Sequence, residues 1–568
     1  MKKILSVLLV MAMLLSLAAC GGSGDGDSTA SGTASSGSAD ATQSQTTDDS
    51  NYNKILTVGI SADPTTWEPW AAFSNGRRDT MPMVYQTLTA VIVDLDTNTM
   101  NTYWVLASGA EQIDDNTYEI TIREGIYDTA GNDFNANDVA FSYTTAKELG
   151  TLSQLNAIKE VVALDEYTVQ MTTNNTLSVG DFEDLLTGFN MVTQASYEAS
   201  PDGMVSQPVG TTGYVMESYT AGSGVVFTKA DTEYWNQAAN DSKSVDDGYC
   251  YIWETGNVDT VNFDIISDTS TMAIALETGA IDITSRVSIN DIDLFEKSDD
   301  FSVYSYPENM YGISFNVSDS AVTSNYNLRM AIALAVDSQQ VLDATFNGDG
   351  LVLKAWSYPT YADYQSVWDK EDYFEYDLTK AKEYLEKFYA ETGESASTLK
   401  LRLLTQTDAT MQKATLAIQN LIIALVGNES CCTIEQYDMA TYTQTWKDET
   451  AFEICVLNSQ SFVRSYTTYA WNNFANALKA VHKQNIFFDD NEELQELLNV
   501  ALNPKTHSDA SVQAYQEYIN ENVLMKNLCS GTLYGVAADW IDGLEYVVGP
   551  KAAIAVCALD YDWAAANK

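Results

Sequence analysis

From residue 55 onward, the chain alternates between segments with the pattern of β-strands and segments with the pattern of α-helices. Residues 55–60 are a continuous apolar run, and residues 118–123 alternate between polar and apolar side chains, as half-buried strands do. Residues 378–390 follow Asp377, a good N-cap, and carry apolar side chains on one helical face. Residues 416–426 predict an apolar helix that stops at a Gly-Asn pair. This alternation predicts an α/β fold.

Three further segments extend the pattern. Residues 454–457 predict a buried strand, and residues 492–502 and 512–524 predict helices. The roughly 510 residues that follow Ser50 exceed what one hydrophobic core usually organises, so we expect two or three structural units.

The first twenty residues have the pattern of an export signal. Two lysines precede an apolar stretch at residues 4–17, and a Leu-Ala-Ala sequence precedes Cys20. This pattern is typical of a secretory signal peptide, whose apolar stretch is too short to span a membrane. The cysteine after Leu-Ala-Ala resembles a bacterial lipoprotein signal, in which that cysteine carries two acyl chains. We therefore expect residues 1–19 to be removed and Cys20 to anchor the chain to the outer face of the bacterial cell membrane. The alternative is an ordinary secreted protein.

Residues 20–50 predict a tether. They are almost wholly Gly, Ser, Thr, Ala, Asp and Gln, with no aromatic or large aliphatic side chain after the cysteine. Such a segment cannot bury enough apolar surface to offset its ordering entropy, so we expect disorder and an end-to-end distance of about 30 Å.

Composition excludes several functions. The chain has 79 acidic and 29 basic residues, a net charge of −50, so nucleic acid is not an expected partner. Its two histidines have no metal-ligand spacing, so neither a metal nor a cofactor is expected. The cysteines form no CxxC pair, and the adjacent Cys431 and Cys432 are interpreted as packed thiols. A Gly-x-Ser-x-Gly elbow, a phosphate loop and a zinc motif are absent from the sequence after the tether, so we do not expect an enzyme.

The most specific motif lies at residues 106–142. It contains Leu-Ala at 106–107, DDNTYEITIREG at 114–125 and AGNDFNANDVAFS at 130–142. Further motifs follow in order: PVGTTGY at 208–214, Tyr-Trp at 234–235, ALETGAID at 275–282, SFN at 314–316, LRMAIALAVD at 328–337 and YDLTKAK at 376–382. Together they resemble the dipeptide/oligopeptide-binding family of extracellular solute-binding proteins of ABC importers, family 5. The resemblance runs from residue 55 to the C-terminus.

Several residues of these motifs have a structural explanation of their own. Gly125 and Gly131 flank a turn and suit positive φ. Asp138 is interpreted as the N-cap of a helix at 141–147. Arg329, on an apolar helix, is expected to form a salt bridge rather than to bind a substrate carboxylate. These motifs therefore predict the fold more than the ligand.

The resemblance implies a two-lobed, hinge-closing periplasmic-binding-protein-like α/β fold, with an extra subdomain in the first lobe. Lobe I would comprise residues 51–315, with the subdomain at about 82–205, and lobe II residues 316–531. Residues 532–568 would return to lobe I. The chain would cross between lobes near 313–316 and again near 532–536. The family's closed form binds its solute as a monomer and docks on the transmembrane subunits of an ABC permease.

The expected pocket departs from the family pattern at one place. Peptide binders of this family often hold the peptide's amino group with an aspartate shortly after the strand corresponding to residues 453–457. Here the following stretch contains Asn458, Ser459, Gln460 and Arg464 but no carboxylate. These side chains suit hydroxyls, amides or an anionic group. The ligand could therefore be a peptide, a modified peptide or a sugar, or the clamp could come from another loop.

Aromatic and polar residues on other expected cleft loops complete the candidate site. They are Trp67, Ser74 and Asn75 in the first lobe, Tyr311 at the crossover and Trp356 in the second lobe. Large flat side chains would hold extended backbone or sugar rings. The competing interpretation for each aromatic residue is core packing.

The sequence therefore predicts a membrane-anchored solute-binding component of an ABC importer that delivers a small solute, first of all a peptide, to its permease. Three alternatives stay open. The same scaffold could bind a sugar or another non-peptide solute, or serve as a peptide or pheromone sensor. The third is an exported hydrolase.

Overall fold

The computed structural model describes residues 55–71, 75–94, 99–230, 259–361, 363–369, 373–459, 491–541 and 546–548. The chain divides into two units, residues 1–50 and 51–568, and all described residues belong to the second. The predicted signal peptide, Cys20 and the tether lie outside the described residues.

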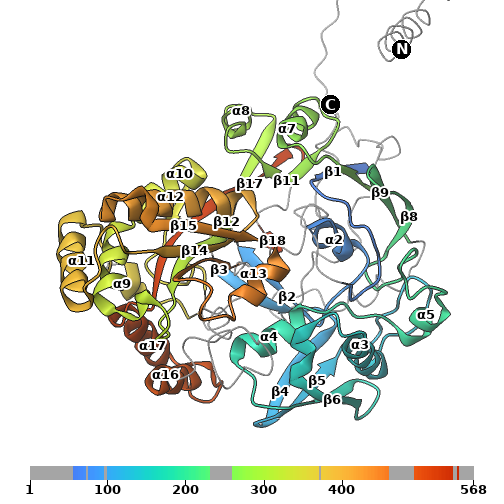
Figure 1. Ribbon diagram of the computed structural model, residues 1–568. Helices are drawn as coiled ribbons and strands as arrows, with labels where there is room; N and C mark the ends of the chain where they lie inside the picture. Colours follow the sequence, from blue (N-terminus) through green and yellow to red (C-terminus); the bar gives the residue numbers. More distant parts are fainter. Residues whose placement is uncertain are drawn as a thin grey trace, which may run out of the picture. The chain divides into compact units, whose positions relative to one another are not determined.

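The central element is an eleven-stranded mixed sheet (Figure 1). Its order is β15 (Cys432–Tyr437), β14 (Leu401–Gln406), β16 (Ile454–Ser459), β12 (Phe301–Phe315), β17 (Met525–Ala538), β11 (Ile283–Val287), β1 (Ile55–Ile60), β10 (Thr260–Ile265), β9 (Gly224–Lys229) and β8 (Tyr214–Thr220). A short strand, β13 (Gly350–Val352), also pairs with β17.

The long strands β12 and β17 join the two halves of this sheet. They pair antiparallel with each other from Phe301 opposite Ala538 to Ser314 opposite Met525. On one side of this pair, β1 lies parallel to both β10 and β11. On the other side, β14 lies parallel to both β15 and β16. Each long strand thus belongs to both halves. The predicted lobe boundaries fall at the end of β12 and inside β17, and the division at those residues stays a prediction.

Two smaller sheets lie within or next to the segment expected to form the extra subdomain. One is antiparallel, in the order β4 (Ala107–Asp114), β5 (Thr117–Ile122), β7 (Thr168–Thr173) and β6 (Ile158–Ala163). The other has the order β18 (Tyr546–Val548), β2 (Thr89–Asp94) and β3 (Thr99–Trp104). The helices of this region are α2 (Asn75–Thr80), α3 (Ala136–Leu149), α4 (Val179–Thr187) and α5 (Gln194–Ala199).

The remaining helices follow the later strands. They are α7 (Thr269–Glu277), α8 (Ile292–Glu296), α9 (Tyr326–Ala335), α10 (Ser338–Phe346), α11 (Leu378–Thr392), α12 (Ala409–Val426), α13 (Met439–Thr445), α16 (Glu492–Leu502) and α17 (Asp509–Glu521). Short 3₁₀ turns are η2 (Met81–Met83), η3 (Ser153–Ala157), η6 (Val322–Ser324), η7 (Ser366–Asp369) and η8 (Glu429–Cys431). By length and composition alone α12 could cross a membrane, but it buries Met411, Ile418 and Ile422 in a core that it shares with α9 and α11.

The local predictions are largely confirmed. The apolar run at 55–60 is β1, and the alternating segment at 118–123 is β5 shifted by one residue. Asp377 caps α11 by accepting a hydrogen bond from the Lys380 amide, 2.9 Å away. Gly427 ends α12 in the left-handed conformation, with φ of 73°. Gly125 and Gly131 have φ of 73° and 90°, as a turn at those positions requires.

The predicted buried strand and the two C-terminal helices are also present. Residues 454–457 lie in β16, and residues 492–502 are α16. The last helix, α17, begins earlier than predicted because Ser508 caps it by accepting a hydrogen bond from the Ser511 amide.

Two predictions were wrong in their details. The N-cap of α3 is Asn135, because its side chain accepts from the Asn137 amide; Asp138 instead accepts from the Asn135 amide and completes a capping box. Arg329 makes no ion pair with any described residue. Its guanidinium donates to the carbonyls of Thr323, Ser324, Asn522 and Val523, at 2.6–3.0 Å. It holds the turn before β17 against the start of α9.

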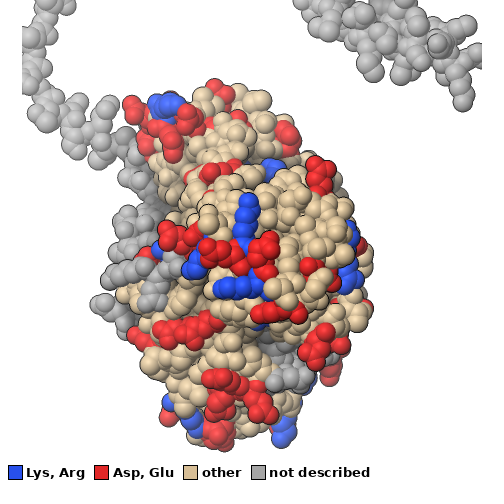
Figure 2. Space-filling view, turned by 60° about the vertical axis from the view of Figure 1, so that its left-hand side comes forward, with Lys and Arg blue, Asp and Glu red and all other residues tan. Residues whose placement is uncertain are grey.

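The described cysteines and the surface charge are as the sequence predicts. Cys431, Cys432, Cys455 and Cys529 are buried free thiols, so the interpretation of the adjacent pair as packed residues is confirmed. In Figure 2, acidic side chains lie in separate groups across the face shown, with basic side chains between them. On that face the negative charge is distributed rather than gathered into one patch.

One ion pair connects distant parts of the chain. The ammonium of Lys505, in the segment between α16 and α17, pairs with the carboxylate of Asp115, in the turn between β4 and β5. Both side chains are largely exposed. This contact links the four-stranded sheet to the C-terminal helices.

Candidate functional site

The parallel strands on each side of β12 and β17 indicate where a ligand would bind. In sheets of this kind, ligands bind beyond the carboxyl ends of the strands. The carboxyl end of β16 lies against β12, with Asn458 opposite Tyr311 and Ser459 opposite Met310. The neighbouring parallel strand β14 ends at Gln406, and its continuation leads into α12. We call the region around Tyr311, Gln406 and Asn458 the crossover junction.

The strand β12 is irregular at the crossover junction. Pro307 pairs with Thr532, but the next regular pair is Met310 with Ser530, so β12 contains one extra residue. The carbonyl of Glu308 accepts hydrogen bonds from the hydroxyls of Tyr358 and Ser530, the latter at 2.9 Å. A bulge of this kind bends a strand and re-aims a side chain, and such bulges are frequent next to binding sites.

The Glu308 side chain is in an unfavourable environment for a negative charge. Burial raises the pKa of its carboxyl group to about 7, and the nearby carboxylate of Asp408 acts in the same direction. The positive charge of Arg286 partly offsets this rise. Among the described residues, the carboxylate has no hydrogen-bond donor. Glu308 is thus a mostly buried acidic group that lacks a protein partner in this part of the chain.

Arg286 lies on β11, on the other side of β17 from Glu308. Its strand is also irregular, because Thr284 pairs with Val536 and Val287 with Tyr534, which leaves one extra residue in β11. The Nε atom of Arg286 is buried, and no described residue accepts a hydrogen bond from it. Burial raises the pKa of Asp79, and the charges of Arg78, 2.9 Å away, and of Arg286 oppose that rise.

Three polar side chains come from the carboxyl ends of the parallel strands. The Gln406 amide donates to the Asn458 side-chain oxygen at 3.2 Å. Asp408 caps α12 by accepting from the amides of Thr410 and Met411, at 2.9 and 3.0 Å. The crossover junction therefore combines an arginine, two carboxylates and two side-chain amides.

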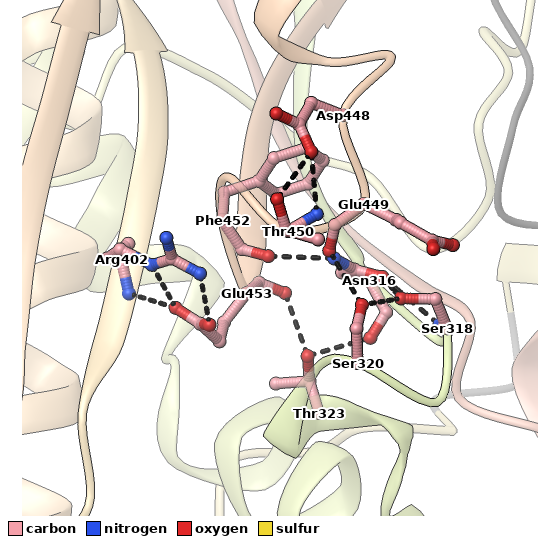
Figure 3. Close-up of polar contacts among 10 residues, drawn as sticks. All are labelled: Asn316, Ser318, Ser320, Thr323, Arg402, Asp448, Glu449, Thr450, Phe452 and Glu453. Carbon is pink, nitrogen blue, oxygen red and sulfur yellow. Dashed lines mark hydrogen bonds and ion pairs between the residues drawn. The ribbon is translucent and has the colours of Figure 1, made fainter.

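A second polar cluster lies at the far end of β12 and differs in being saturated (Figure 3). The Asn316 amide donates to the carbonyls of Glu449 and Phe452, at 2.7 and 2.8 Å, and its oxygen accepts from Ser318. Thr323 donates to the carbonyls of Asn316 and Glu453. These bonds fix the loop before β16 to the end of β12. The Ser-Phe-Asn motif at 314–316 therefore has a structural role.

An ion pair completes this cluster. The Glu453 carboxylate accepts from the backbone amide, Nε and a terminal nitrogen of Arg402, at 2.7, 3.1 and 2.8 Å. The Glu453 side chain is almost fully buried, whereas Arg402 is partly exposed. A buried carboxylate with three donors leaves little bonding capacity for a ligand. We call this second group the Asn316 cluster.

The three predicted aromatic ligand contacts are packed in the core. Trp67 lies edge-on to Tyr219 and Phe227, and Tyr311 lies edge-on to Phe346 at 5.4 Å between ring centres. Trp356 covers the backbone of Gly312, where a Cβ atom would come within 2.7 Å of the indole ring. All three side chains are at most 3% exposed. Their contact with a ligand stays a prediction.

The predicted polar contacts have different positions. Asn458 is half-buried at the crossover junction, next to the backbone of Ser459. Asn75 is the first residue of α2. The side chains of Asn75 and Ser459 and the residues Ser74, Gln460 and Arg464 lie outside the described part of the structure. Their ligand contacts also stay predictions.

Arg286 and Glu308 were not among the predicted site residues, although the sequence contains a signal for them. Each is a charged residue within a strand pattern, and Glu308 follows a proline inside the 15-residue strand β12. Proline within a strand marks an edge or a bulge. That signal identifies an irregular position, but it does not identify the partner strand.

Comparisons with known proteins agree with this architecture. Residues 102–474 match the family described as bacterial extracellular solute-binding proteins, family 5. The chain belongs to this family. The match contains β12, β14 and β16, and with them most of the crossover junction.

The individual relatives of this family 5 protein share about a quarter of the aligned residues with it. Di/tripeptide-binding protein 1 of Pseudomonas aeruginosa is 26% identical over 303 residues, 48% of this chain and 52% of that protein. The glutathione-binding protein GsiB of Salmonella typhi is 26% identical over 342 residues, 59% of this chain and 61% of its own length. The chain thus matches just over half of the length of these curated relatives.

A solved structure extends the likeness to most of the chain. The ABC transporter substrate-binding protein CtaP of Listeria monocytogenes superimposes with a TM-score of 0.66 at 17% identity, covering 86% of this chain and 95% of CtaP. At that identity the likeness concerns the fold alone. The predicted two-lobed α/β solute-binding fold is confirmed, and the relatives named are binding proteins.

Proposed function

We propose that this family 5 protein is the solute-capturing component of an ABC importer and that its solute is a peptide. The observation that carries the proposal is the family match over residues 102–474, which includes the strand ends of the crossover junction. The names of the relatives, a di/tripeptide-binding and a glutathione-binding protein, support a peptide as the first choice. No catalytic step is part of the proposal.

The proposed mechanism is capture by lobe closure. The solute binds at the crossover junction, where groups from β11, β12, β14 and β16 meet, and closing of the lobes removes it from water. Asn458 and Ser459 keep their proposed role, because β16 ends there. Trp67, Tyr311 and Trp356 are proposed to form the packed walls around the site.

The proposed location follows from the leader sequence. Cys20, with two acyl chains, would hold the protein at the outer face of the membrane, and residues 20–50 would give it reach. Anchoring beside the permease raises the effective concentration of the closed, loaded form at its docking site. In a Cys20→Ala variant we expect loss from the membrane fraction or an unprocessed chain. Unchanged membrane retention would contradict the anchor.

The test of the solute is native mass spectrometry of the full chain, extracted in mild detergent from cells grown on rich medium. A series of bound masses matching short peptides would support the proposal. A single co-purified mass that matches a sugar or another non-peptide metabolite would contradict the peptide assignment, while leaving the solute-binding function in place.

A further inference from the structure

Arg286 and Glu308 each lie at an irregular position on one of the two strands that flank β17. In β11, Thr284 pairs with Val536, and the next regular pair is Val287 with Tyr534. In β12, Pro307 pairs with Thr532, and the next regular pair is Met310 with Ser530. Each strand therefore has one extra residue next to the same central strand. The irregularity in β11 lies opposite Tyr534–Val536 and the one in β12 opposite Ser530–Thr532, about four residues apart along β17. Strands separated by one intervening strand are about 10 Å apart, so a ligand bound by both side chains would lie across β17.

The two side chains influence one another but do not pair. The charge of Arg286 lowers the pKa of the Glu308 carboxyl group, which indicates an electrostatic interaction between the two groups. Nevertheless, within the part of the chain that the structure describes, no ion pair joins them and neither side chain has a hydrogen-bond partner. The Nε atom of Arg286 is also buried. Polar groups removed from water without partners are costly, so opposite charges in this state favour a ligand that completes them.

The other charged groups described in this region are engaged with other partners and do not bind Arg286 or Glu308. Asp79 is already paired with Arg78 at 2.9 Å, and Asp408 is engaged as the cap of α12. The Asn316 cluster has its own internal partners, as does the Arg402–Glu453 pair within it. Among the described residues of the crossover junction, Arg286 and Glu308 are therefore opposite charges whose side chains make no hydrogen bond.

We propose that Arg286 and Glu308 together bind a zwitterionic ligand, Arg286 taking a carboxylate and Glu308 taking an amine. Arginine presents a planar fork that matches a carboxylate, and a buried carboxylate is a strong acceptor for an ammonium group. Glu308 lies two residues before Met310, which pairs with Ser459. It therefore provides an acidic group just beyond β16, where the sequence after Asn458 provides none. This inference rests on the proposed solute-binding function.

The test uses the full chain and three random tripeptide-to-pentapeptide libraries: free at both ends, N-acetylated, and C-amidated. Binding is measured by native mass spectrometry and by competition at pH 8. We expect the wild type to bind the free library about tenfold to a hundredfold more tightly than either blocked one. Glu308→Gln should remove the preference for a free amine, and Arg286→Gln the preference for a free carboxylate. Arg286→Lys should restore part of the carboxylate preference.

Matched controls separate this role from a general loss of charge. Glu449→Gln and Lys297→Gln neutralise exposed groups away from the crossover junction and should leave both preferences unchanged. A thermal melt of each variant shows whether it is folded, and Glu308→Ala replaces Glu308→Gln if the latter is not. Equal binding of free and blocked libraries, or preferences retained in both variants, would overturn the inference alone. Binding of none of the libraries would overturn the proposed peptide function and this inference with it.

Discussion

The two polar clusters of β12 differ in how completely their groups are bonded. In the Asn316 cluster, one side-chain amide donates to two carbonyls and accepts from Ser318, and Glu453 accepts three hydrogen bonds from Arg402. At the crossover junction, Glu308 and Arg286 are largely buried and have no such partners among the described residues. Burial of polar groups is therefore not by itself a sign of function. Saturation distinguishes a cluster that holds the fold from one that is suited to a ligand.

The prediction with the largest expected effect concerns Trp356 and asks whether this side chain stabilises the fold or contacts the ligand. Trp356 is 3% exposed and packs over Gly312. We expect Trp356→Ala to lower the free energy of unfolding by about 3–5 kcal/mol, because it leaves a large cavity. Urea denaturation measures this loss, and Trp356→Phe, which retains a ring, should lose less. Weakened ligand binding at unchanged stability would instead favour the interpretation of Trp356 as a ligand contact.

The second prediction breaks the saturated cluster. Asn316→Ala removes the hydrogen bonds that its side-chain amide donates to the carbonyls of Glu449 and Phe452, and we expect a loss of about 3 kcal/mol in the free energy of unfolding. Ser320→Ala removes one exposed hydrogen bond to the same Glu449 carbonyl and serves as the control, with a change below about 0.5 kcal/mol. Ligand affinity of the folded protein should be the same in both variants. Lost affinity at wild-type stability would contradict a purely structural role.

The third prediction concerns the unsaturated cluster. Burial raises the pKa of Glu308 from 4.5 to about 7, so the folded state binds its proton more tightly than the unfolded state does. Its contribution to stability is therefore complete below about pH 4.5 and is lost as the pH rises to about 7. Relative to wild type, Glu308→Gln should gain about 2 kcal/mol of unfolding free energy between pH 5 and pH 8.

This pH experiment compares chemical denaturation of wild type and Glu308→Gln at the two pH values. The charged and titratable groups that act on Glu308, or that it acts on, are Arg286, Asp408, Tyr311 and Cys529. They are present in both proteins, so the difference isolates Glu308. A difference that does not vary with pH would show that Glu308 titrates like an exposed glutamate.

The prediction with the smallest expected effect concerns the ion pair between Asp115 and Lys505, which belongs to neither cluster. Asp115→Asn removes the exposed ion pair with Lys505, and solute affinity should change by less than about fivefold and only at low salt. The control is Asp293→Asn, which removes a somewhat more exposed pair with Lys297 that is local to α8. An equal change in the control would mean that the effect is one of net charge. No change in either variant would mean that the Lys505 pair does not contribute to binding.

The parts of the fold that were predicted correctly depend on local patterns. The strand at 55–60 and the helix at 492–502 are defined by neighbouring apolar residues, and the caps Asp377 and Gly427 act within one turn. Asp138 was placed wrongly because a capping box uses two polar residues three positions apart, and the sequence offers either as the cap.

The parts that were missed depend on distant segments. Arg329 was expected to meet a carboxylate, but two of its acceptors are backbone carbonyls of Asn522 and Val523, which no side-chain pattern reveals. Arg286 and Glu308 lie on different strands, and only the pairing of β17 with both strands brings them to the same part of the sheet. Asn458 and Ser459 lie at the crossover junction, at the carboxyl end of β16. Their place could be predicted because the apolar pattern at 454–457 shows where this strand ends.

The extra residue in β12 has a mechanical consequence. Relative rotation of two lobes that share β12 and β17 is easiest where the ladder between these strands is already interrupted, and the interruptions lie close together, between Pro307 and Met310 and between Tyr311 and Gly312. Points on a rotation axis barely move. Glu308, at the first of these interruptions, would keep its place whether the lobes are apart or together, so a solute's amine could be bound at the start of closure and released last on opening.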